Sequence, residues 1–227
     1  MSAGRCYLVM QRGHHDQPFC LDSEDRDDYL ASVMAAALGQ GLWVHAWAVL
    51  DRVAYLLVTP QRASSLSAVM QQLGRRYARH FNSRWGRRGS PWDGRYRSCW
   101  VNAETLGLVV SVWMDHQICA MGLAADPSDW RWGSACILAG AGRAPATWPF
   151  QPLPAYWSCG NTPFEREAAY RGLLCEGVRQ EDSAMVASAL SRGSPILTPA
   201  DWFGLGDDEK AFWETRPRGR PRRSSQA

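Results

Sequence analysis

The stretch "LWVHAWAVLDRVAYLLVTP", residues 42–60, decides the fold of this chain. It contains two apolar, β-rich runs, residues 42–50 and 53–60, separated by the polar pair Asp51 and Arg52. Such a short separation is typical of a β-hairpin, and the two strands of a hairpin run antiparallel. The stretch therefore predicts an antiparallel sheet and argues against a doubly wound parallel one.

The segments on either side of the hairpin extend this prediction to the order β-α-β-β-α-β-α. A strand is expected at residues 5–13, and a helix over residues 22–41 is capped by Asp22 or Ser23. Apolar residues recur at helical spacing from Leu66 to Phe81, and a strand and a long helix follow near residues 95–122. This order favours a ferredoxin-like antiparallel sheet of four or five strands, with helices 66–85 and 104–119 on one face.

The second part of the chain reads as an extension of this sheet domain. Residues 140–160 are rich in Gly, Pro and Trp and are typical of a connecting segment. Helices are expected near residues 164–177, 181–192 and 207–214, followed by a basic tail. The predicted organisation is one α+β domain over residues 1–140, and a linker, helical extension and basic C-terminal tail over residues 141–227.

Composition excludes several classes of protein. A hydrophobic fraction of 46% and twelve Trp indicate a packed globular chain. No apolar run approaches the roughly 18 residues that a membrane span needs, and the start of the chain lacks a signal-peptide pattern. Seven Cys without a C-x-x-C pair fit reduced thiols and argue against a structural zinc site. We expect a cytoplasmic protein that makes no membrane contact.

The net charge of +3 conceals two basic clusters. Eight arginines and one acid, Asp93, lie between Arg75 and Arg97, and the last twelve residues hold five arginines and no acid. Such clustering favours a polyanionic partner, and the alternative interpretation is a pair of solvated faces.

Several stretches together resemble one protein family. They are "VMQRG", "DRDDYL", "LLVTP", "MQQLGRRYARHFNSRWGRRGSPWDGRYRS", "DPSDWRWGSA" and "PRGRPRR". In this succession they are similar to the REP-associated tyrosine transposases, IS200-like single-strand transposases of the HUH superfamily. The resemblance implies a ferredoxin-like transposase fold. It also implies an ancestral reaction in which a tyrosine hydroxyl cuts one DNA strand, while two strand histidines hold a divalent metal such as Mg²⁺ or Mn²⁺.

The residues that carry this reaction in the family are absent here. The two histidine positions fall on Val53 and Tyr55, and neither side chain is a good ligand for Mg²⁺ or Mn²⁺. The nucleophile position falls on Trp113, which has no hydroxyl. Gln117, four residues on, is the one remaining ancestral ligand position. His45 lies on the neighbouring strand, where it either contacts the pocket or, as is more common for such a histidine, is packed or at the surface. We therefore predict no catalytic residue, no metal site and no cofactor, with Val53, Tyr55 and Trp113 filling the emptied pocket.

DNA binding does not depend on the lost residues. Trp85, Trp92 and Tyr96 are candidates for stacking on exposed bases, although Trp92 is equally well explained as a core residue. The tail sequence Arg-Gly-Arg-Pro at 218–221 resembles an AT-hook that would contact AT-rich duplex, and the alternative is a non-specific basic tail. The predicted DNA-binding residues are Arg75, Arg76, Arg79, Arg84, Arg87, Arg88, Arg95, Arg97, Arg218 and Arg220.

Three functions remain open from the sequence. The favoured one is a DNA-binding protein related to these transposases that binds hairpin or single-stranded DNA and no longer cuts it. The second is an active metal-assisted transposase or nickase with altered residues. The third is a protein-interaction module with a relic basic groove.

Overall fold

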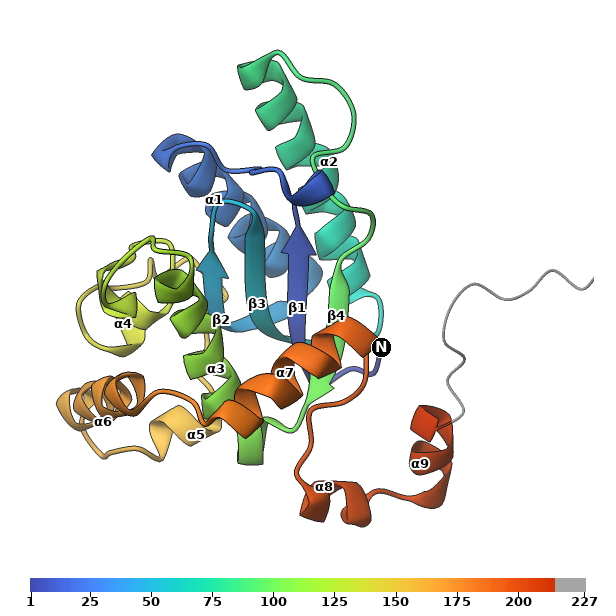
Figure 1. The fold of residues 1–227 in the computed structure, drawn as a ribbon, viewed down its shortest axis with the longest axis vertical. Helices are drawn as coiled ribbons and strands as arrows, with labels where there is room; N and C mark the ends of the chain where they lie inside the picture. The colour runs from blue at the N-terminus through green and yellow to red at the C-terminus, as the bar shows by residue number, and fades with distance from the viewer. Residues whose placement is uncertain (215–227) are drawn as a thin grey trace, which may run out of the picture.

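The protein is built around one antiparallel sheet, seen in a computed structural model that describes residues 1–214 (Figure 1). The strands are β1 (Cys6–Arg12), β2 (Leu42–Val49), β3 (Val53–Pro60) and β4 (Arg97–Val101), in the order β2-β3-β1-β4. All neighbouring strands are antiparallel, and β2 and β3 form the predicted hairpin. This order and direction confirm the ferredoxin-like sheet.

Helices α1 (Ser23–Gln40) and α2 (Ser65–Trp85) cover one face of the sheet. Asp22 caps α1 by accepting a hydrogen bond from the Asp25 amide, and Gly41 ends the helix in the left-handed conformation at φ 66°. Leu66, Val69 and Leu73 of α2 are fully buried, as the helical spacing predicts. Together with alternate residues of the strands, the two helices enclose the first hydrophobic core.

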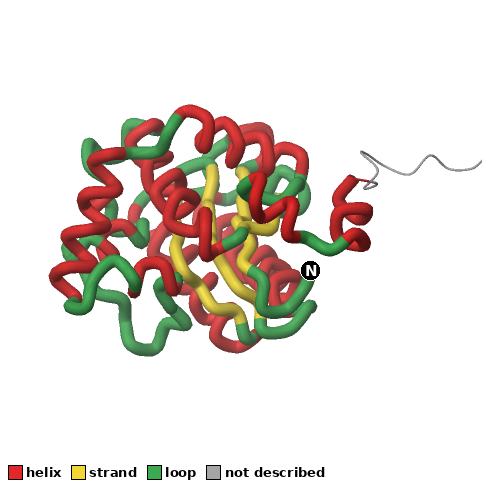
Figure 2. Tube along the Cα trace, turned by 90° about the horizontal axis from the view of Figure 1, so that it is seen from below, coloured by secondary structure: helices red, strands yellow, loops and turns green. Residues whose placement is uncertain are grey.

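Helix α3 (Ala103–Ala120) lies on the opposite face of the sheet, so the prediction that α2 and α3 share one face is wrong. Figure 2 shows helices on both sides of the strands. The physical reason is that β3 is apolar on both faces: Ala54 and Leu56 point to the α1–α2 side, whereas Tyr55 and Leu57 point to the α3 side. A single helical layer would have left one apolar face in water.

The helical extension contributes directly to this second face. Helix α7 (Gln180–Arg192) packs against β4 and β1, and Val186 and Leu190 join the core around α3. A third apolar cluster surrounds Tyr170 of α6 (Pro163–Glu176). Helices α6, α7 and α9 (Asp207–Glu214) lie where the sequence predicts them. The short helices α4 (Ala135–Leu138), α5 (Pro154–Trp157) and α8 (Pro199–Gly204) are additional.

Among the described residues, no helix is long and apolar enough to cross a bilayer.

Candidate functional site

The positions to which the resemblance assigns transposase chemistry meet on the α3 face of the sheet. Val53 and Tyr55 of β3 and Trp113 of α3 are each less than 10% exposed and belong to one cluster, here called the Tyr55–Trp113 cluster. The two aromatic rings meet edge to face, with centroids 5.3 Å apart and planes at 80°. The Trp113 indole also donates a hydrogen bond to Ser183 Oγ at 3.2 Å. The side chains of Val53, Tyr55 and Trp113 therefore pack closely in the space between β3 and α3.

The side chains that would help a metal ion bind are engaged elsewhere. Gln117 donates its amide to the Trp113 carbonyl at 3.0 Å. The imidazole of His45 bonds to the Gln151 carbonyl at 2.6 Å and to Thr59 Oγ1 at 2.8 Å. Thr59 lies at the far end of β3 from Val53, so His45 is a packed residue, which is the second of the two alternatives given for it. Over residues 1–214, no group of three or more His, Cys, Asp or Glu could hold a metal ion.

The Tyr55 hydroxyl is a poor nucleophile in this environment. Burial raises the pKa of Tyr55 above its ordinary value of 10, and the nearby positive charge of Arg12 only partly opposes that rise. The phenol therefore stays protonated at neutral pH. A protonated phenol attacks a phosphodiester only after a base or a metal ion has helped to remove its proton.

Three arginines of α2 form an exposed row on the side of the helix that faces away from the sheet. Arg75, Arg76 and Arg79 line an open depression of about 390 Å³, together with Gln40, Gln71 and Gln72. Within the described part of the chain, no carboxylate forms an ion pair with any of the three. We call these residues the α2 arginine row. Guanidinium and amide groups side by side can contact consecutive phosphates and bases.

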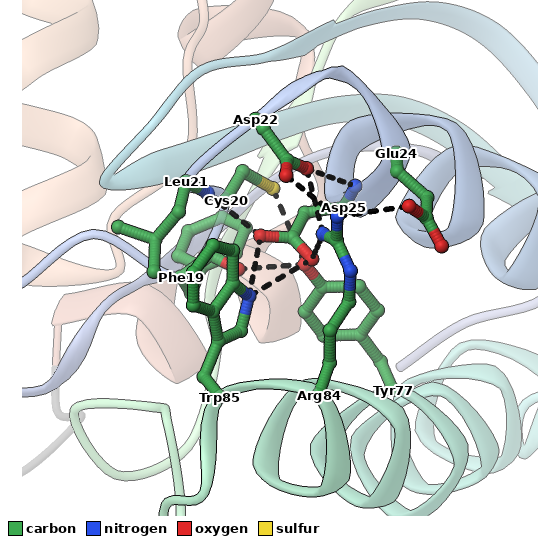
Figure 3. A network of polar contacts seen from close by, with 9 residues as sticks. All are labelled: Phe19, Cys20, Leu21, Asp22, Glu24, Asp25, Tyr77, Arg84 and Trp85. Carbon is green, nitrogen blue, oxygen red and sulfur yellow. Dashed lines mark hydrogen bonds and ion pairs between the residues drawn. The ribbon is translucent and has the colours of Figure 1, made fainter.

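Arg84, in contrast, is part of an internal network that joins α2 to the start of α1 (Figure 3). Its guanidinium donates to both oxygens of Asp22 at 2.7 and 2.6 Å and to Asp25 Oδ1 at 2.6 Å. The hydrogen bond from Arg84 is the main reason that the pKa of Asp22 falls to about 2. The Trp85 indole donates to the fully buried Asp25 carboxylate at 3.0 Å. With its donors occupied by these acids, Arg84 holds two helices together, and its expected role in DNA binding has no support in this geometry.

The candidate stacking residues have different surroundings. Trp92 is 7% exposed and packs among Phe19, Tyr29 and Tyr77, so it is a core residue. Tyr96 is half-buried against the same core. Trp85 keeps 40% of its surface exposed at the end of α2 and is the only one of the three with a large accessible ring.

The remaining arginines are exposed but do not flank one cleft. Arg87, Arg88 and Arg95 lie in the segment that joins α2 to β4, with the Arg87 guanidinium 5.5 Å from the Phe81 ring centroid. Arg97 begins β4 on the α3 face, whereas the α2 arginine row lies beyond the opposite face. The basic helix and the basic end of β4 therefore lie on different sides of the sheet. Arg218 and Arg220 fall outside the described residues.

Comparison with known proteins found two solved structures of similar fold. No family model and no curated protein matches the sequence. The chain is similar in structure to a REP-associated tyrosine transposase bound to a REP hairpin, with 14% identity and a TM-score of 0.49; the match covers 65% of this chain and 86% of that one. It is also similar to a transposase candidate from Deinococcus radiodurans, with 22% identity and a TM-score of 0.36, over 48% of this chain and 93% of that one.

Proposed function

We propose that this protein binds hairpin or single-stranded DNA, is descended from REP-associated tyrosine transposases and no longer cuts DNA. One observation carries the proposal: seven of the eight arginines between 75 and 97 are exposed, and none of these seven forms an ion pair within the described residues. The exception is Arg84, whose partners are internal acids. The other seven side chains remain available for phosphates.

Binding through such groups is largely electrostatic. If about four to six phosphates are contacted, log affinity should fall against log salt concentration with a slope of about −3 to −5. The arginines of α2 lie along one helix, so they can follow one strand of a stem, while Trp85 is exposed near the end of that helix.

The loss of cleavage follows from the chemistry of the Tyr55–Trp113 cluster. Valine offers no lone pair, tryptophan offers no hydroxyl, and Tyr55 is buried and protonated. We expect no nicking of a single-stranded or hairpin oligonucleotide in Mn²⁺ or Mg²⁺. We expect the same of the combined variant Val53→His, Tyr55→His and Trp113→Tyr, because a repacked pocket need not reopen. Metal-dependent nicking by the unaltered protein would show instead that it is an active enzyme.

The experiment that tests DNA binding is a salt titration on a hairpin and on a duplex. Arg75→Ala combined with Arg79→Ala should flatten the slope by about one to two units and weaken binding roughly 8-fold to 60-fold near 0.1 M salt. The matched control combines Arg143→Ala with Arg192→Ala, which removes the same charge from two exposed arginines outside α2. Equal curves for the two double variants would mean that the α2 arginine row is only a solvated face.

A further inference from the structure

A pocket of about 740 Å³ lies at the end of the sheet that carries Thr59, away from the Tyr55–Trp113 cluster. Its lining comes from all four strands, from the start of α3 and from residues 151–157, which include α5. Small-molecule sites usually enclose about 300–1,000 Å³, so this pocket is large enough for a metabolite-sized ligand. None of its lining residues belongs to the α2 arginine row, so the proposed DNA binding gives it no role.

Three indole rings in the lining are suited to a cation. They belong to Trp43 of β2, Trp100 of β4 and Trp157 of α5, and none of the three is fully buried. The face of an indole carries partial negative charge and attracts a cation within about 6 Å of the ring centroid. The Arg5 guanidinium already lies 4.3 Å from the Trp100 centroid, and the Arg166 guanidinium, outside the pocket lining, lies 4.6 Å from that of Trp157. No arginine or lysine of the described chain lies over Trp43, so a ligand cation there would add a new contact.

The charged groups of the lining leave one carboxylate available. Arg5 is paired with Glu209 of α9, so its positive charge is largely neutralised. Glu104, in the first turn of α3, is exposed and forms no ion pair among residues 1–214. Burial raises the pKa of the Cys6 thiol to about 12, so that group carries no charge. The pocket therefore offers a cation one unpaired acid and no unpaired base.

The hydrogen bonds of His45 make Thr59 an acceptor toward the pocket. A carbonyl can only accept, so the 2.6 Å contact with the Gln151 carbonyl places a hydrogen on His45 Nδ1. Burial lowers the pKa of His45 below its ordinary value of 6.5, and the hydrogen bond to Gln151 only partly opposes that fall, so the imidazole is neutral at pH 7. Its Nε2 atom then carries no hydrogen and accepts from the Thr59 hydroxyl at 2.8 Å. With its own hydrogen used, the Thr59 oxygen offers a ligand only lone pairs, as the Glu104 carboxylate does.

We infer that this pocket binds a small organic compound with a guanidinium group, which stacks on Trp43, donates to Thr59 and forms an ion pair with Glu104. Trp43 and Thr59 are opposite each other in the pairing of β2 with β3, so their side chains are neighbours. A guanidinium group suits them because its flat face stacks on an aromatic ring while the N–H groups at its edge bind oxygen acceptors. It is also more weakly hydrated than an ammonium group, so it loses less on leaving water. The inference does not depend on the proposed DNA binding, because it rests on other residues.

The test is isothermal titration calorimetry of the full chain with butylguanidinium, butylammonium and butylurea. Butylurea has the shape of butylguanidinium without its charge, so it measures what the apolar lining contributes by itself. Butylguanidinium should bind at one site, butylammonium more weakly, and butylurea not at all at the same concentrations. At a butylguanidinium concentration tenfold above its Kd, the melting temperature should rise by about 3–6 °C.

Two substitutions locate the bound cation. Trp43→Leu keeps an apolar side chain but removes the aromatic face, and should weaken binding about 2-fold to 30-fold, whereas Trp43→Phe should retain part of the affinity. Glu104→Gln should weaken binding about 2-fold to 5-fold. The matched control is Glu181→Gln, which removes an exposed acid from the first turn of α7 and should change nothing. Because Glu104 is exposed, its replacement remains informative even where Trp43→Leu lowers stability.

Four results would overturn the inference. The first is no binding of butylguanidinium, and the second is equal binding of butylurea, which would show only an apolar slot. The third is unchanged affinity in both Trp43→Leu and Glu104→Gln, which would place the cation elsewhere. The fourth is binding that appears only after deletion of residues 216–227, which would make an arginine of this chain the occupant. The salt titration on DNA is a separate measurement, so the proposed function stands or falls independently of these results.

Discussion

Replacing Trp113 by Ala tests whether the Tyr55–Trp113 cluster is a packed structural core. Trp113 is 6% exposed, meets the Tyr55 ring at 5.3 Å and donates a hydrogen bond to Ser183. Truncating a buried Trp to Ala costs about 3–5 kcal/mol, because apolar contact is lost and a cavity remains. For a chain of this size, the expected fall in melting temperature is about 6–20 °C.

A double-mutant cycle isolates the contact between the two rings. Trp113→Ala, Tyr55→Ala and the combined variant are unfolded in urea and followed by far-UV circular dichroism, since twelve Trp would complicate a fluorescence signal. The coupling energy should be about 0.5–1.5 kcal/mol, the usual value for an edge-to-face aromatic pair beyond its buried area. Affinity for the DNA hairpin should not change below the melting temperature, because the α2 arginine row lies on the other face of the sheet.

The matched control is Trp157→Ala. Trp157 is 52% exposed, so the same replacement there should cost no more than about 1 kcal/mol. If Trp113→Ala cost no more than Trp157→Ala, the cluster would not be a packed core. Packing would then not explain why Val53, Tyr55 and Trp113 occupy these positions.

Three further predictions concern other parts of the molecule. Arg84→Ala should lower the melting temperature because the buried Asp25 carboxylate loses its ion-pair partner. The dependence of DNA affinity on salt concentration should stay unchanged, and a flatter slope would indicate that Arg84 contacts DNA. Burial raises the pKa of Asp115 from 3.8 to about 8, opposed by the hydrogen bond from Tyr170, so the folded state holds a proton that the unfolded state releases. The contribution of Asp115 to the free energy of unfolding is therefore complete below about pH 4 and is lost as pH rises to about 8, with a slope of up to about 1.4 kcal/mol per pH unit. Urea titrations at several pH values measure this slope, and Asp115→Asn should abolish it. Deleting residues 216–227 should weaken binding of AT-rich duplex more than of a hairpin, and equal losses would indicate a non-specific basic tail.

The order of elements could be predicted from sequence because it depends on local information. A two-residue separation between apolar runs defines a hairpin. The sequence offers Gly39 or Gly41 as the end of the first helix, and α1 ends at Gly41. The sequence also shows Val53, Tyr55 and Trp113 at the positions where the resemblance implies two histidines and a tyrosine. The structure adds that Val53, Tyr55 and Trp113 form one cluster. The resemblance implied this proximity, whereas the spacing of apolar residues along the chain did not.

Only the tertiary structure decided what each face and each arginine does. Periodicity shows that α2 and α3 each have an apolar side but does not show which face of the sheet each one covers, and the two cover opposite faces. Arg84 and Asp25 are 59 residues apart in the chain, so their ion pair arises from the packing of α1 against α2. Arg12 carries no distinguishing signal in the sequence, and its place beside Tyr55 comes from the register between β1 and β3. Contacts between distant segments depend on how elements pack against one another, and that packing is a property of the whole fold.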